Sequence, residues 1–252
     1  MSLPIWTADE LRSKWIKSNG VCWRVVEAQN KVSTLKLVDN LEEQTLLENL
    51  IEDTKPSIPP ELKNHHYLIS TPFRYRPYRG GSRFRRENQE QGVFYASENV
   101  DTAIAETAFY KALFFNESPD TSLPQNASEH TAFSVNYASD ICVDLSLQPF
   151  SKYESYWKNP VNYVPCQAFA DQCREAGVEI IKSVSVRCPN KGKNINILHW
   201  NAIKDTAPVD LQTWKVSIKE AEIVAIREFP KKSLSFPIKN FFSDPRIKKR
   251  KR

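Results

Sequence analysis

The sequence predicts an α+β protein, with helices packed on a mixed or antiparallel sheet and a helical extension at the N-terminus. Two observations carry this prediction. Short apolar runs typical of strands alternate with helical patterns, but they lack the regular spacing of βαβ units. In addition, 252 residues are enough to bury a sizeable core, and no internal repeat divides them.

Capping patterns mark two helices near the N-terminus. Thr7 opens a capping box with the glutamate three residues on, and Gly20 would end that short helix. Asn40 would begin a second helix, which ends near Pro56. The apolar face of that second helix consists of Leu46, Leu47, Leu50 and Ile51.

The chain then divides into three parts, of which the third is the C-terminal tail at residues 241–252. Residues 1–60 form the helical extension, with one strand at 22–26, and residues 61–240 form the main domain. In that domain Asp101 would cap a helix at 102–115, and a second helix would cover 166–176. The predicted strands are 92–97, 131–137, 140–145, 178–187, 194–200 and 222–229.

The formal net charge of +5 is concentrated at the C-terminus. After Pro245 the chain reads RIKKRKR, and without these residues the rest of the chain has a net charge near −1. Residues 241–252 are therefore expected to form a basic, disordered tail. A nucleic-acid-binding domain would carry its excess charge on the folded body, so this distribution argues against that class.

Composition indicates neither a metal site nor a disulfide framework. The five cysteines form no CxxC pair, and the four histidines do not cluster with them. No apolar run is long enough to span a membrane, and residues 1–20 lack a signal-peptide core. We therefore expect a cytoplasmic protein without a bound metal.

Residues 72–86, PFRYRPYRGGSRFRR, contain six arginines interleaved with aromatic residues. Such a stretch could bind nucleic acid, form a solvated surface, or line a site for a small anion. An arginine fork holds a phosphate with two hydrogen bonds, and glycines allow the backbone to approach a pyrophosphate closely. Four of the six arginines are expected to be solvated: Arg76, Arg79, Arg85 and Arg86.

Glu106 is the only acidic residue between Asp101 and Glu117, and Phe109 and Tyr110 follow it at helical spacing. A carboxylate among such neighbours is either a structural group with satisfied hydrogen bonds or a functional group with a chosen partner. The pattern alone does not decide between the two.

Four blocks in order resemble the RES domain, the toxin of RES–Xre toxin–antitoxin pairs. They are TPFRYRPYRGGSRF, GVFYAS, TAIAETAFYKALFF and SVSVRCPNKGKNINIL, which lie between residues 70 and 200. Residues 23–56 resemble the N-terminal extension of the longer members. The resemblance implies a fold related to the ADP-ribosyltransferase toxins and an enzyme that cleaves NAD+ at the nicotinamide–ribose bond.

The resemblance also assigns site residues. By motif they are Arg74, Tyr75, Gly81, Ser82, Arg83, Tyr95, Glu106 and Ser185. Arg24 is an alternative to Arg74 as the first family arginine, and Ser183 is an alternative to Ser185. Short members of the family carry Trp-Asn after the second arginine, where Phe84-Arg85 stands here.

The implied chemistry suits a site with one carboxylate. Glycosidases generally use two, because an alkoxide leaving group must be protonated. Nicotinamide leaves a pyridinium as a neutral molecule, so Glu106 would need only to stabilise the cationic ribose. Arg74 and Arg83 would hold the pyrophosphate beside Gly81 and Ser82. Tyr75 and Tyr95 would pack on the rings, and Ser185 would hydrogen-bond the substrate.

Three functions are consistent with these residues. The leading one is an NAD+-cleaving toxin without a cofactor, a glycohydrolase if water attacks or a phosphorylase if inorganic phosphate is a co-substrate. Its partner would be an Xre-type antitoxin, through which it would meet nucleic acid only indirectly. The second is a protein ADP-ribosyltransferase, and the third a nucleic-acid-binding protein that uses residues 72–86 and the tail. The oligomeric state is open, with a dimer among the options.

Overall fold

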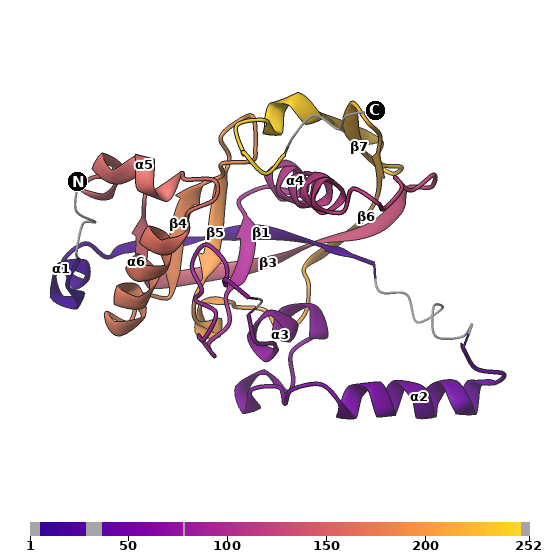
Figure 1. Cartoon of the computed structure of the whole chain (residues 1–252). Helices are drawn as coiled ribbons and strands as arrows, with labels where there is room; N and C mark the ends of the chain where they lie inside the picture. The colour runs from indigo at the N-terminus through magenta and orange to yellow at the C-terminus, as the bar shows by residue number, and fades with distance from the viewer. Residues whose placement is uncertain (1–5, 29–36, 78, 248–252) are drawn as a thin grey trace.

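The computed structural model describes residues 6–28, 37–77 and 79–247, and they form a mixed α+β fold around one sheet (Figure 1). Eight strands of the described chain pair in the order β1-β2-β5-β4-β3-β6-β7-β8. The β3–β4 pair is parallel and the other neighbouring pairs are antiparallel. The predicted fold class, α+β with a mixed sheet, is therefore confirmed.

The strands are β1 (Ile16–Glu27), β2 (Phe94–Ser97), β3 (Ser128–Asp144), β4 (Ile180–Val184), β5 (Lys193–Ile197), β6 (Asp210–Ile218), β7 (Glu222–Arg227) and β8 (Lys232–Pro237). The α-helices are α1 (Ala8–Arg12), α2 (Leu41–Asp53), α3 (Tyr67–Arg74), α4 (Val100–Glu117), α5 (Glu154–Trp157) and α6 (Val164–Glu175). A short 3₁₀ helix, η5 (Ile238–Phe241), follows β8.

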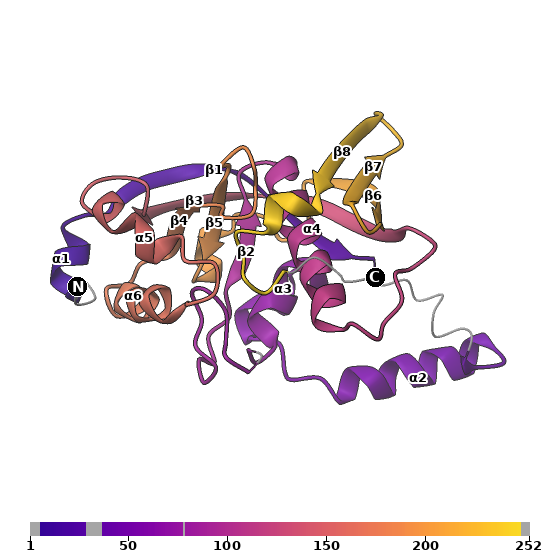
Figure 2. The ribbon, with the colours of Figure 1, turned by 45° about the horizontal axis from the view of Figure 1, so that its top comes forward.

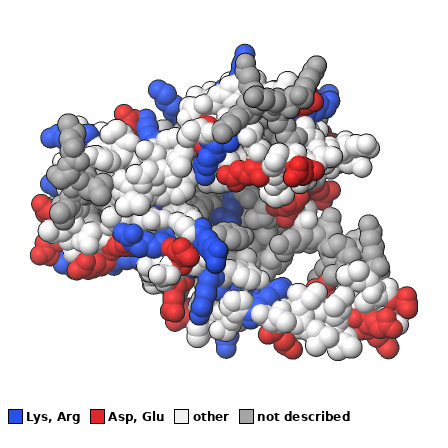
Figure 3. Space-filling view, in the orientation of Figure 1, with Lys and Arg blue, Asp and Glu red and all other residues white. Residues whose placement is uncertain are grey.

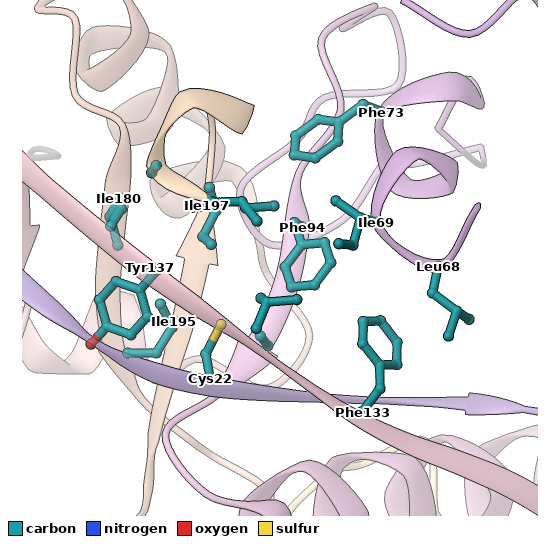
Figure 4. Close-up of a cluster of buried hydrophobic side chains, with 14 of the residues drawn as sticks. Cys22, Leu68, Ile69, Phe73, Phe94, Phe133, Tyr137, Ile180, Ile195 and Ile197 are labelled. Atoms are coloured by element: carbon teal, nitrogen blue, oxygen red, sulfur yellow. The ribbon is translucent and has the colours of Figure 1, made fainter. Parts of the chain in front are cut away.

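Five of the strands close into a ring. β1 pairs with β3 from Ile16 opposite Cys142 to Glu27 opposite His130, and it also pairs with β2 where Trp23 faces Ser97. Since alternate side chains of a strand point to opposite faces, one side chain in two from each strand points into the ring. Figure 4 shows the resulting apolar cluster, which includes Cys22, Phe94, Phe133, Ile180 and Ile195, all fully buried.

Helices pack against the ring of strands and against the rest of the sheet. Leu68, Ile69 and Phe73 of α3 join the cluster inside the ring. Figures 1 and 2 show α1, α5 and α6 gathered at one end of the sheet, and α4 beside β6–β8 at the other. Two further buried clusters hold these layers together, one beneath α6 and one between α4 and strands β6–β8.

The N-terminal 60 residues do not form a separate helical extension. Thr7 caps α1 with the predicted capping box, but the helix ends at Arg12 and Gly20 lies inside β1. The predicted strand at 22–26 is longer, at Ile16–Glu27, and is integral to the sheet. The second helix does form with Asn40 as its cap, and it lies apart from the body with none of its residues buried (Figures 1 and 2).

Several boundaries differ within the main domain. Asn99, not Asp101, caps α4, because its side-chain oxygen accepts the backbone N–H of Thr102. One continuous strand, β3, replaces the two strands expected at 131–137 and 140–145. The sequence analysis missed α3, β6 and β8, whose patterns mix polar residues into short apolar runs.

The C-terminal segment also differs from the expected disordered tail. Phe241 and Ile247 are buried in the cluster under α4, and Asp244 is fully buried. Residues 241–247 therefore belong to the fold. The rest of the predicted tail, residues 248–252, lies outside the described residues.

Replacing phenylalanine by alanine should cost far more stability inside the ring than at the surface. Phe133→Ala removes a fully buried ring and should lower the free energy of unfolding by about 3–5 kcal/mol. Phe229→Ala, at a side chain that is 90% exposed, should change it by less than about 0.5 kcal/mol. Urea unfolding of both variants measures this, and equal losses would contradict the placement of Phe133 inside the ring.

Candidate functional site

Glu106 projects from α4 toward the sheet, and two neutral side chains hold it. Ser185 Oγ donates to Glu106 Oε1 at 2.7 Å, and Asn194 Nδ2 donates to the same oxygen at 2.7 Å. Its neighbours Ile104, Ala105 and Ala108 pack in the buried cluster on the other side of the helix. Among the described residues no side chain donates to Oε2, so one carboxylate oxygen is available to a ligand.

The proton of Ser185 is directed at Glu106. A hydroxyl has one donor and two acceptor positions. The backbone N–H groups of Arg187 and Cys188 donate to Ser185 Oγ at 3.2 and 2.9 Å, which fills the acceptor positions. Ser183, the alternative serine, instead accepts from Asn196 at 3.1 Å. The structure thus brings Ser185 to Glu106 and gives Ser183 another partner.

Asn194 was missed by the sequence analysis. Ser97 Oγ donates to Asn194 Oδ1 at 2.8 Å, which fixes the orientation of the amide and turns its NH₂ group to Glu106. The signal was present in the run KNINI, in which asparagines alternate with buried isoleucines of β5. Two asparagines on one face of a buried strand require partners, and a carboxylate is one that an amide NH₂ can satisfy.

A tight turn presents Arg83 from the arginine-rich stretch. Gly81 has φ +68°, and a Cβ there would collide with the backbone oxygen of Arg85, so the turn requires glycine. Ser82 Oγ lies 2.7 Å from the hydroxyl of Tyr95, which also accepts the backbone N–H of Phe84 at 3.1 Å. Burial raises the pKa of Tyr95, so it stays neutral and serves here as a support for the turn.

The Arg83 guanidinium itself lies against the last residue of α5 and the segment that follows it. Nη1 donates to the carbonyl of Trp157 at 2.7 Å, and Cζ lies 4.8 Å from the centre of the Tyr163 ring. These contacts leave other guanidinium N–H groups of Arg83 for an anion, because Arg carries five.

Tyr110 places Arg83 and Glu106 in one electrostatic neighbourhood. It is one helical turn beyond Glu106, and 53% of the residue is exposed. Burial by the surrounding protein raises the pKa of Tyr110, the charges of Tyr163 and Glu106 raise it further, and Arg187 and Arg83 oppose them. Sequence reasoning assigned no role to Tyr110, Tyr163 or Arg187.

The other residues that the resemblance assigned, Arg74, Tyr75 and the alternative Arg24, do not contact Glu106 or Arg83. Arg74 ends α3 and pairs with Glu52 of α2 at 2.5 Å, while its Nε donates to the carbonyl of Pro56. Tyr75 is partly exposed, and its carbonyl accepts from Arg85 at 2.9 Å. Arg24, the alternative to Arg74, donates to the carbonyl of Tyr95 at 2.7 Å, and burial lowers its pKa to about 10.

The arginine-rich stretch is not a uniform charged surface. Arg85 is buried and donates to three backbone carbonyls, so the expectation that it is solvated is wrong. Arg86 pairs with Asp171 at 2.5 Å, and Arg76 and Arg79 are exposed. Figure 3 shows basic side chains near a hollow in the middle of one face, acidic ones along the upper edge of that hollow, and further acidic ones at the beginning of α2.

The chain belongs to the RES domain family. The family model matches residues 58–236, more than half of the chain. No curated protein matches the sequence. Among solved structures, a chain in the crystal structure of the M. tuberculosis MbcT-MbcA toxin-antitoxin complex is 10% identical, with a TM-score of 0.48 over 86% of this chain and 94% of that chain.

Within the described ranges, no helix is both long and apolar enough to cross a membrane. In the same part of the chain, no three His, Cys, Asp or Glu residues lie together as metal ligands would.

The contact between Asn194 and Glu106 predicts a pH-dependent loss of stability in one variant. Asn194→Asp would put a second carboxylate within hydrogen-bonding distance of Glu106. Such a pair holds its last proton to a higher pH than the same groups do in the unfolded chain, where the values are near 4. The variant should therefore be closest to wild type below about pH 4, and should lose stability as the pH rises through the raised pKa of the pair.

Urea unfolding at several pH values, relative to wild type, measures this effect. Asn194→Leu is the matched control, since it removes the same hydrogen bond without adding charge, and its loss should vary much less with pH than that of Asn194→Asp. If both variants show the same pH dependence, position 194 does not face Glu106.

Proposed function

We propose that this protein cleaves NAD+ at the nicotinamide–ribose bond. The observation that carries the proposal is the state of Glu106. Its carboxylate is held by two neutral donors on one oxygen, which leaves its charge uncompensated there, while the other oxygen is available to a ligand. A fixed anion of this kind stabilises a ribosyl cation, and because nicotinamide departs as a neutral molecule no general acid is needed.

The remaining residues have complementary roles in this proposal. Arg83 binds the pyrophosphate with the N–H groups that Trp157 does not use. Tyr110 and Tyr163, which lie in the same electrostatic neighbourhood, offer ring faces to the nicotinamide or the ribose. Ser185 acts on Glu106 directly, because its proton already points at the carboxylate.

Arg74 has a conditional role. Its guanidinium is engaged by Glu52 and by the carbonyl of Pro56, so it reaches a phosphate only if the contacts with α2 are released. Tyr75 adjoins it and shares this condition. Arg83 is therefore the arginine on which the proposal rests.

Membership of the RES domain family supports a toxin that an antitoxin restrains. We propose an Xre-type antitoxin that covers the site beside Arg83. Transfer of ADP-ribose to a protein would use the same residues with a different acceptor, and the products distinguish the two. Nucleic-acid binding has less support, since Arg74, Arg85 and Arg86 are occupied by internal partners.

Glu106→Gln tests the proposal. It preserves size but removes the charge, so NAD+ consumption should fall by about a hundred- to a thousandfold while the protein stays folded. The assay is NAD+ loss with and without inorganic phosphate, with products identified by mass. ADP-ribose indicates water as the acceptor, ADP-ribose-1″-phosphate indicates phosphate, and a mass gain on protein indicates transfer.

The same two proteins can be expressed in bacteria while growth and cellular NAD+ are followed. Wild type should arrest growth and deplete NAD+, and Glu106→Gln should do neither. NAD+ consumption that is equal in both proteins would refute the role of Glu106.

Arg83→Lys is expected to reduce NAD+ turnover strongly, because an ammonium cannot reproduce the planar fork. Arg86→Lys is the matched control from the same stretch, where a surface pair with Asp171 can be kept by either residue. Steady-state kinetics of both variants provides the measurement. Similar tolerance at the two positions would mean that the stretch does not bind the substrate through Arg83.

A further inference from the structure

The C-terminal segment, residues 237–247, lies outside the region that the family model matches. It nevertheless packs against α4, the helix that carries Glu106. Figure 2 shows η5 next to α4, and the Phe241 and Phe109 rings meet there with centroids 5.6 Å apart. Beyond η5, Asp244 is fully buried. A fully buried carboxylate is costly unless its charge is paired, so its partners indicate why it is there.

The partners of Asp244 are two arginines. Arg187 Nη1 lies 2.9 Å from Oδ2, and Arg246 donates to both carboxylate oxygens at 2.8 and 3.0 Å. Burial works to raise the pKa of Asp244, but the hydrogen bonds from Arg246 and the charge of Arg187 outweigh it, and the pKa lies below its ordinary value. Asp244 is thus the ionised counter-ion of Arg187.

Arg187 connects this carboxylate to Ser185. Its side chain is 3% exposed, its Cζ lies 3.6 Å from the centre of the Phe109 ring, and Nη2 donates to the carbonyl of Pro160 at 2.8 Å. At the other end of the same residue, the backbone N–H donates to Ser185 Oγ. The side chain of Arg187 therefore fixes the backbone that orients the Ser185 hydroxyl.

The same cluster also holds the segment that precedes α6. The carbonyl of Pro160 accepts from Arg187 at 2.8 Å and from Arg246 at 3.2 Å. Pro160 is three residues before Tyr163, whose ring lies against Arg83. One buried carboxylate thus anchors the loop that carries Ser185 and the segment that carries Tyr163.

We propose that Asp244 is a positioning residue of the active site, which acts through Arg187 to hold the Ser185 hydroxyl on Glu106. The proposal rests on the proposed function for its effect on catalysis, though not for the geometry itself. When the charge of Asp244 is removed, Arg187 lacks its buried counter-ion and turns away. The N–H groups of residues 187 and 188 then cease to fix Ser185, and Glu106 loses a directed donor.

Asp244→Asn is the central variant, because it keeps the shape and removes the charge. The kcat for NAD+ cleavage should fall by about ten- to a hundredfold, as for other misplacements of catalytic groups. Arg187→Lys, which retains a charge without the fork, should show the same pattern. The double variant should be no worse than Arg187→Lys alone if both act through one link.

Ile223→Ala is the control for a loss of stability alone. Ile223 is fully buried in the cluster under α4, and it has no polar link to Arg187. This variant should unfold more readily yet retain the wild-type kcat under conditions where it is folded. If its kcat falls in proportion to that of Asp244→Asn, Asp244 is a structural brace and the proposal is wrong.

Amide hydrogen exchange provides a readout that does not depend on NAD+. Exchange at Arg187 and Cys188 should be faster in Asp244→Asn than in wild type, and unchanged in Ile223→Ala. Unchanged exchange there in Asp244→Asn would overturn the positioning role. If exchange responds as expected while wild type consumes no NAD+, the proposed function fails and the positioning link stands.

Discussion

Two hydrogen bonds to a single oxygen of Glu106 join α4 to the loop after β4 and to the first residues of β5. A carboxylate with apolar neighbours must find donors, so these hydrogen bonds, together with the apolar cluster under α4, hold the helix on the sheet. Both donors are neutral, and the negative charge therefore persists in a partly buried place. The cations around it differ in their partners. Arg187 is neutralised by Asp244, whereas the partners of Arg83 among the described residues are uncharged: the Trp157 carbonyl, the Cys166 thiol and the Tyr163 ring.

The arginine-rich stretch shows why a count of charges does not identify a binding surface. Arg85 serves as a backbone clamp, satisfying the carbonyls of Tyr75, Gln89 and Glu90. Arg74 and Arg86 pair with acids from elsewhere in the chain. These arginines differ in the partners that the fold brings to them: backbone carbonyls within ten residues for Arg85, and acids from distant segments for Arg74 and Arg86.

Local patterns predicted what depends on local interactions. The fold class, the caps of α1 and α2, and the position of Glu106 on a helix follow from periodicity and capping chemistry. Asn99 and Asp101 are both good caps only two residues apart, and propensity does not choose between them. The roles of Asn194, Arg187 and Asp244 depend on pairings between segments that are more than 50 residues apart in the sequence. Asn194, for example, is 88 residues from Glu106. A local pattern such as KNINI can show that Asn194 needs a partner, but it does not identify the partner.

β1 has a consequence for any attempt to reduce the protein to the region that the family model matches. That region begins at residue 58, whereas β1 covers Ile16–Glu27 and pairs along β3 from His130 to Cys142. A fragment of residues 58–236 would expose this edge of β3 as a long row of unpaired backbone N–H and C=O groups. Exposed edges of that kind recruit strands from other molecules and promote aggregation. The first strand thus serves as a solubility device for the domain as well as a part of its core.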